Sequence, residues 1–134
     1  MNQEQMLNTK ESLTEVVSTD PKEAKKEQYA AEIRKWKHTH RRVKALFITE
    51  DDDLSVLFFR MPTRHQLASA ETLSVDAAGK ADLYKRAERL IVDCLLGGDL
   101  TVEQILDDAE VYMAAAQFVL YDLVPQKKTS WESC

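Results

Sequence analysis

The chain has 134 residues, which is the size of one ordinary domain. Its contents of 31% charged and 44% hydrophobic residues exclude both a membrane protein and a charge-rich disordered chain, and three glycines and three prolines argue against a turn-rich all-β sandwich. The formal charge of −5 does not favour non-specific binding to nucleic acid or anionic lipid. Composition therefore predicts a soluble, mostly helical protein.

The first predicted element is a helix over about residues 21–38, preceded by a polar and flexible arm over residues 1–19. Asp20 is suited to the N-cap, and Pro21 at the next position lacks an amide that would have no partner there. Glu23 is placed to close a capping box. One narrow apolar stripe marks the buried side of this helix, formed by Tyr29, Ile33 and Trp36.

A β-hairpin follows the helix. Residues 42–49 and 54–60 are rich in β-branched and aromatic side chains, and the acidic segment 50–53 between them suits a tight antiparallel connection. Apolar residues lie on both faces of both strands. Because an isolated two-stranded hairpin is marginally stable in water, we expect helices or another subunit to cover it.

Helices account for the rest of the predicted domain. Capping boxes open helices at Thr63 and Thr101, and between them a helix over about 80–96 ends at Gly97-Gly98. The helix after Thr101 runs to Pro125, with a break expected at Asp107-Asp108. The predicted fold is mostly helical α+β: an N-terminal helix, an antiparallel hairpin and a bundle of three to four helices over residues 20–125, followed by a flexible tail over 126–134.

The last helix carries more apolar surface than a small domain needs. Its main stripe runs from Ile105 to Leu123, and a second stripe of Val111, Ala115 and Phe118 lies nearly opposite. An apolar arc of this width indicates a central helix or one shared with a partner.

No catalytic, cofactor or metal site is predicted. Cys94 lies on an apolar helix face and is expected to act as a small hydrophobe, and the histidines have no metal-ligand spacing. Glycine-rich phosphate loops and serine nucleophile motifs are absent from the sequence. The acidic segment 50–53 lacks the spacing of an EF-hand and is interpreted as a solvated turn.

Bases gather in residues 34–44, which hold six of the 18 lysines and arginines. With Trp36 as a stacking group, this segment could contact nucleic acid through Lys35, Lys37, Arg41 and Arg42. The simpler interpretation places Trp36 in the core and the bases in solvent, and the acidic total charge favours it.

Several short motifs occur in a familiar order: Trp36-Lys37 at the end of a basic helix, residues 58–64 at the end of the strand pair, residues 87–95 leading into Gly97-Gly98-Asp99, and the Ala-rich residues 114–117. In these features residues 34–124 resemble the small tail assembly chaperones of tailed bacteriophages and prophages. The resemblance implies a non-enzymatic protein that binds the tape measure protein while the tail tube polymerises around it. It implies no cofactor and no catalytic residues.

A chaperone for a long amphipathic partner needs exposed apolar surface. The sequence-based candidates are the second faces of the hairpin and of the last helix: Leu46, Ile48, Leu57, Phe59, Val111, Ala115 and Phe118. Two alternatives stay open, a structural virion component of the neck or tail-completion kind and a small nucleic-acid-binding regulator, and self-association is also left open. Without a signal peptide or an apolar run long enough for a membrane span, the expected location is the host cytoplasm.

Overall fold

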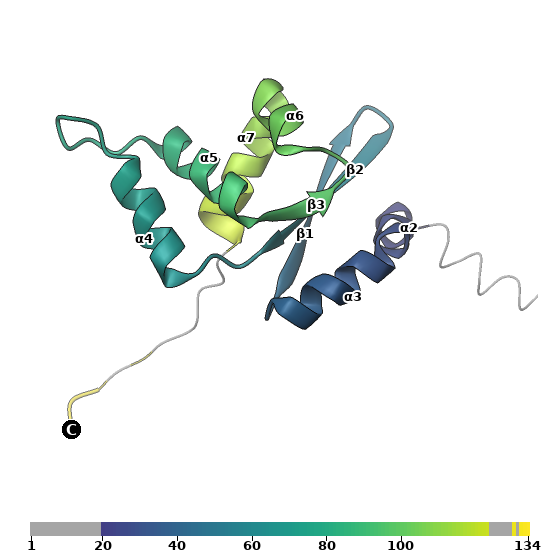
Figure 1. The fold of residues 1–134 in the computed structure, drawn as a ribbon, viewed down its shortest axis with the longest axis horizontal. Helices are drawn as coiled ribbons and strands as arrows, with labels where there is room; N and C mark the ends of the chain where they lie inside the picture. Colours follow the sequence, from purple (N-terminus) through teal and green to yellow (C-terminus); the bar gives the residue numbers. More distant parts are fainter. Residues whose placement is uncertain (1–19, 124–129, 131) are drawn as a thin grey trace, which may run out of the picture.

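The structure is a computed structural model that describes residues 20–123, 130 and 132–134. The expectations for residues 1–19, and for 126–129 and 131 of the tail, lie outside the described residues. The elements, in chain order, are α2 (Pro21–Gln28), α3 (Ala30–Thr39), β1 (Val43–Glu50), β2 (Asp53–Arg60), α4 (Arg64–Leu73), α5 (Leu83–Cys94), β3 (Leu95–Gly98), α6 (Val102–Asp107), α7 (Ala109–Gln117) and the π-helical turn η1 (Phe118–Asp122). This mostly helical α+β fold confirms the predicted class (Figure 1).

The predicted hairpin is present, and it is part of a larger sheet. Strands β1 and β2 pair antiparallel from Val43↔Arg60 to Glu50↔Asp53, around a two-residue turn in which Asp51 has a φ of 52°. Strand β3 then pairs antiparallel with the other side of β2, which gives the order β1-β2-β3. The centre of the sheet is therefore β2, and β1 and β3 are its two edges.

The third strand corrects the prediction that one helix runs over 80–96 and stops at Gly97-Gly98. Helix α5 ends at Cys94, and Leu95 is already extended, with φ −68° and ψ 122°. Gly98 lies so close to β2 that an added Cβ would stand 2.3 Å from the carbonyl oxygen of Val56. The glycine pair thus allows a close contact between two strands. The same Gly-Gly sequence is also typical of a helix end, which is why the sequence alone predicted one.

Helices cover both faces of the sheet, as the two-sided apolar pattern of the hairpin predicted. On one face the rings of Tyr29 and Trp36 pack on Phe58, with centroid separations of 5.2 and 5.3 Å. On the other face Leu57 and Phe59 are fully buried in a cluster with residues of α5, α6 and α7. In Figure 1, α2 and α3 lie on one side of the strands and α5 to α7 on the other.

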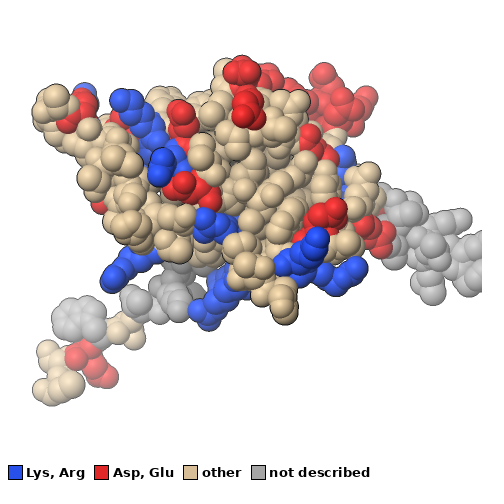
Figure 2. Space-filling view, in the orientation of Figure 1, with Lys and Arg blue, Asp and Glu red and all other residues tan. Residues whose placement is uncertain are grey.

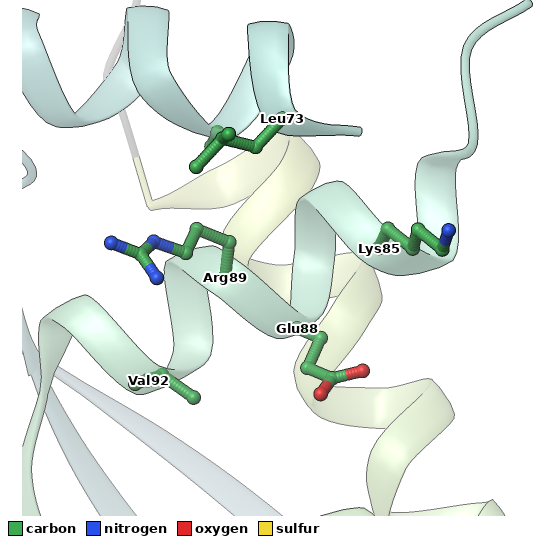
Figure 3. Close-up of a pocket in the computed structure, with 6 residues that line it drawn as sticks. Leu73, Lys85, Glu88, Arg89 and Val92 are labelled. Atoms are coloured by element: carbon green, nitrogen blue, oxygen red, sulfur yellow. The ribbon is translucent and has the colours of Figure 1, made fainter. Parts of the chain in front are cut away.

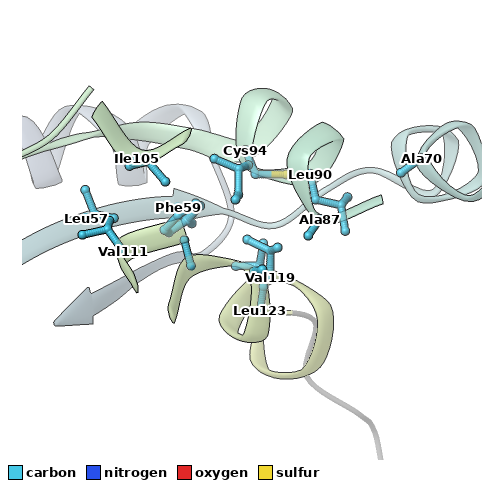
Figure 4. Packing of buried hydrophobic residues seen from close by; sticks show 13 residues of the cluster. Leu57, Phe59, Ala70, Ala87, Leu90, Cys94, Ile105, Val111, Val119 and Leu123 are labelled. Carbon is cyan, nitrogen blue, oxygen red and sulfur yellow. The ribbon is translucent and has the colours of Figure 1, made fainter. Parts of the chain in front are cut away.

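The main core lies between the sheet and the C-terminal helices (Figure 4). Its fully buried members include Phe59 of β2, Ile91 of α5, Ile105 of α6 and Leu123, which directly follows η1. Phe118 adds an aromatic contact, with its ring centroid 5.2 Å from that of Phe59.

Most helix ends follow the local signals in the sequence. Thr63 and Thr101 both form the predicted capping boxes, and Asp108 separates α6 from α7 by accepting amides of the second helix. The N-terminal helix differs from the prediction because it is divided at Tyr29 into α2 and α3. Asp20 caps α2 as expected, but Glu23 pairs with Lys26 at 3.2 Å instead of closing a capping box.

Candidate interaction surfaces

The residues predicted to bind a partner do not form an exposed surface. Leu57, Phe59, Val111 and Ala115 are at most 4% exposed. Leu46, Ile48 and Phe118 are half-buried and pack against the same core. The expected exposure of these residues is wrong, because the second face of the hairpin and the second stripe of the last helix cover each other within one chain.

A different set of apolar side chains is exposed, where the start of α5 lies beside α7 and η1. Leu83, Tyr84, Met113 and Tyr121 are between 46% and 66% exposed. With Ala116, Gln117 and Leu120 they line a hollow of about 220 Å³, which we call the α5–α7 groove. The Tyr112 hydroxyl donates to the carbonyl oxygen of Tyr84 at 2.6 Å, and this bond fixes one rim of the groove.

A second hollow of about 350 Å³, here called the α4–α5 hollow, lies on the other side of α5 (Figure 3). It is lined by Leu73 of α4 and, from α5, by Lys85, Glu88, Arg89 and Val92, with Ala70 at its base. Leu73 is 65% exposed and Val92 is 48% exposed, so the apolar part of this hollow is open to solvent.

We call the surface that comprises the α5–α7 groove and the α4–α5 hollow the outer side of α5. Apolar residues lie at its two margins, and charged residues lie between them. Lys85, Glu88 and Arg89 provide both signs of charge. On the face shown in Figure 2, acidic and basic side chains are likewise interspersed around α4 and α5. Exposed apolar strips of this kind, bordered by charges, suit the apolar face of an amphipathic helix.

The sequence does not single out this surface, because helical periodicity places Leu83, Tyr84 and Met113 on the same stripes as buried apolar residues. The 3.6-residue period identifies the apolar side of a helix, but it does not indicate how much of that side the neighbouring helices cover. The one local signal is the pair of tyrosines at 84 and 121, since tyrosine is suited to surfaces that are partly wet.

The basic segment at the end of α3 does not present Trp36 as a free surface on which a base could stack. Lys35, Lys37, Arg41 and Arg42 are exposed. The Trp36 ring packs on Phe58 and stands about 3.1 Å from where a Cβ of residue 97 would be. Trp36 therefore packs on the sheet, as the simpler interpretation expected, but it is half-buried and lies outside the buried core.

Asp99 accepts three hydrogen bonds from separate segments of the chain, and its role is structural. Its carboxylate accepts from Lys25 Nζ at 3.0 Å, Tyr29 Oη at 2.6 Å and the Val56 amide at 2.9 Å. Its own amide donates to the Val56 carbonyl at 2.8 Å. Asp99 therefore continues the β3 ladder and ties α2 to the sheet; we call these contacts the Asp99 clasp.

The Asp99 clasp shifts the pKa values of the Asp99 carboxyl group and the Tyr29 hydroxyl group. Desolvation would raise the pKa of Asp99, but the hydrogen bonds from Tyr29, Lys25 and Val56 outweigh it and lower the pKa below its usual value. The hydrogen bond to Asp99, with burial, raises the pKa of Tyr29 to about 12. These shifts favour the ion pair and the neutral phenol at physiological pH.

Chemistry at Cys94 is disfavoured by its surroundings. Burial raises the pKa of the Cys94 thiol to about 11, so the thiolate is scarce at neutral pH. Within the described part of the chain, no group of three or more His, Cys, Asp or Glu side chains is placed to hold a metal ion.

Comparison of the chain with protein-family models, with curated proteins and with solved structures finds no match. Among the described residues, no helix combines the length and apolarity needed to cross a bilayer.

Proposed function

We propose that this chain is a non-enzymatic tail assembly chaperone, which binds an amphipathic helix of a phage tape measure protein through the outer side of α5. The observation that carries the proposal is the α5–α7 groove, where four large apolar side chains are about half exposed or more. A tape measure is long and largely helical, so it would expose apolar stripes until the tail tube surrounds it. The proposed site of action is the host cytoplasm.

The dimensions of the surface support a helical ligand. The twelve residues of α5 span about 18 Å, the length of roughly three turns. A helix lying along α5 would present side chains at i, i+3, i+4 and i+7. These side chains could enter the α5–α7 groove, while Lys85, Glu88 and Arg89 would pair with charges at the margin of the ligand helix.

Co-expression with the tape measure protein of the same phage tests the proposal. We expect the two proteins to co-purify, and we expect Tyr84→Asp or Tyr121→Asp to abolish the complex, because each places a charge in the groove. Val75→Asp is the matched control, since Val75 is 43% exposed and lies outside the groove. If wild-type protein and tape measure do not associate, the proposal is wrong.

Analysis of purified virions separates this proposal from the structural alternative. An assembly chaperone leaves before the tail is complete, so the chain should be absent from mature particles. A stoichiometric presence there would instead identify a virion component.

A further inference from the structure

The outer edge of β1 is a long strand edge without a partner in the described structure. The strand covers eight residues, Val43–Glu50, and pairs only with β2. No backbone hydrogen bond joins β1 to any other described segment. The opposite edge, β3, is only four residues long. Unpaired edges of this length promote pairing with another chain unless they are protected.

Both faces of β1 are only half-buried. Residues 43–48 all keep part of their surface, whereas the neighbouring Val56, Leu57, Phe58 and Phe59 are at most 1% exposed. A hollow of about 170 Å³ also opens beside the strand, lined in part by Ile33, Val43 and Ala45. Another strand added to this edge would complete the burial on both faces.

The protection usual at sheet edges is weak on β1. The strand contains no proline. Its single lysine, Lys44, is turned back toward the body, where its Nζ donates to the carbonyl oxygen of Asp122 at 2.8 Å. The register of β1 against β2 is continuous from Val43 to Glu50, so no bulge twists this edge away.

The hairpin turn determines which backbone groups point outward. Because Glu50 and Asp53 pair directly across a two-residue turn, Glu50 exchanges both of its hydrogen bonds with β2. The backbone amides and carbonyls of even-numbered residues of β1 therefore point toward β2. Those of the odd-numbered residues from Val43 to Thr49 point outward, away from the sheet. The hydrogen bonds of β2 follow the same alternation. Val56 lies opposite Phe47, and its carbonyl points away from β1 and accepts the Asp99 amide on the β3 side.

From this pattern we propose that the protein forms a two-fold symmetric homodimer, in which β1 pairs antiparallel with β1 of a second copy. The register places Phe47 opposite Phe47 of the second copy, with two copies of the three-stranded sheet forming one six-stranded sheet. Odd residues then face odd residues, as the outward hydrogen bonds require.

Charge complementarity selects this register. With Phe47 on the axis, Lys44 faces Glu50 of the second copy, and symmetry forms this pair twice. Leu46 faces Ile48 on the same side of the sheet. A shift of two residues in one direction places Lys44 opposite Ile48. A shift in the other direction places Leu46 opposite Glu50 and Lys44 opposite Asp52, which lies in the turn outside the strand, so both shifts lose the Lys44–Glu50 pairs within the strands.

Charge reversal tests the dimer. We expect wild-type protein to sediment as a dimer, and Lys44→Glu or Glu50→Lys to weaken dimerisation about tenfold or more, because each single change creates two like-charge pairs. The double variant Lys44→Glu/Glu50→Lys should recover the dimer. Glu50→Lys leaves the Lys44–Asp122 contact untouched.

A control matches the charge changes. Lys35→Glu alters charge on the exposed side of α3, away from β1, and should not change the association. A wild-type monomer over a hundredfold concentration range, or single and double variants that dissociate alike, would overturn the proposal.

Disulfide trapping tests the register itself. In the proposed dimer Ala45 faces Thr49 of the second copy as a hydrogen-bonded pair, with Cα atoms about 5.5 Å apart, which suits a disulfide. Within one chain these two positions are about 13 Å apart and cannot be bridged. Ala45→Cys/Thr49→Cys, in a Cys134→Ser background, should oxidise to a covalent dimer, while each single cysteine should not; equal yields from all three would contradict the register.

Discussion

Loss of the Asp99 clasp should destabilise the fold by a measurable and predictable amount. Asp99→Ala removes three acceptor contacts made by one carboxylate whose side chain is only 20% exposed. Lys25 and Tyr29 can turn partly to water, but the Val56 amide sits in the sheet and has no alternative acceptor among its described partners. Hydrogen bonds to charged groups contribute about 1.5–3 kcal/mol each, and they are not additive.

From these values we expect Asp99→Ala to lower the free energy of unfolding by about 3 kcal/mol, out of a total of about 5–15 kcal/mol for a domain of this kind. Chemical denaturation followed by circular dichroism measures the change. Tyr29→Phe is the graded control, because it removes one hydrogen bond and keeps the ring against Phe58; it should cost about 1 kcal/mol. A loss below about 0.5 kcal/mol for Asp99→Ala would refute the reasoning.

The same clasp predicts a pH dependence with a definite sign. The pKa of Asp99 is lowered in the folded state, so its contribution is present above the unfolded value of 3.8 and is lost as pH falls through the folded pKa. The difference in stability between wild type and Asp99→Asn should therefore shrink below about pH 4. A difference that stays constant down to pH 2 would show that the carboxylate charge contributes nothing.

Three further predictions follow from packing. Gly98→Ala should destabilise by several kcal/mol, because its Cβ would overlap the β2 backbone and its φ is +142°; thermal unfolding measures this. Val111→Asp should unfold the protein because Val111 is 4% exposed, whereas Met113→Asp, at a 46% exposed position, should leave the circular dichroism spectrum native. In the native protein a thiol reagent should modify the exposed Cys134 rapidly and the buried Cys94 only after denaturation.

The elements that sequence predicted well are those specified locally. The capping boxes at Thr63 and Thr101 each involve residues three positions apart, and they correctly predict where two helices begin. Asp108 divides the last helix because its side chain also caps a nearby helix start. The alternation in the hairpin indicated two buried faces, and the layers of helices on both sides confirm it. Each of these signals acts between residues that are near in sequence.

The features that sequence missed depend on contacts between distant residues. Whether Gly97-Gly98 ends a helix or forms a strand depends on the approach of Gly98 to Val56, which lies over forty residues earlier. The exposure of Tyr84 depends on how α7 lies beside it, and the burial of Val111 depends on the core that it joins. Periodicity identifies an apolar side of an element, and only the assembled fold decides whether that side is covered.

Burial on both faces of the sheet leaves the two surfaces that we propose for association, and they are suited to different partners. The unpaired edge of β1 offers backbone hydrogen bonds, which suit an extended strand, and the Lys44 and Glu50 charges complement those of a second copy in the proposed register. The outer side of α5 offers exposed side chains and no free backbone, so it selects a helix. Because Glu50 makes no contact with the residues that line the α5–α7 groove, Glu50→Lys should affect self-association without affecting binding at Tyr84, and the two proposals can fail independently.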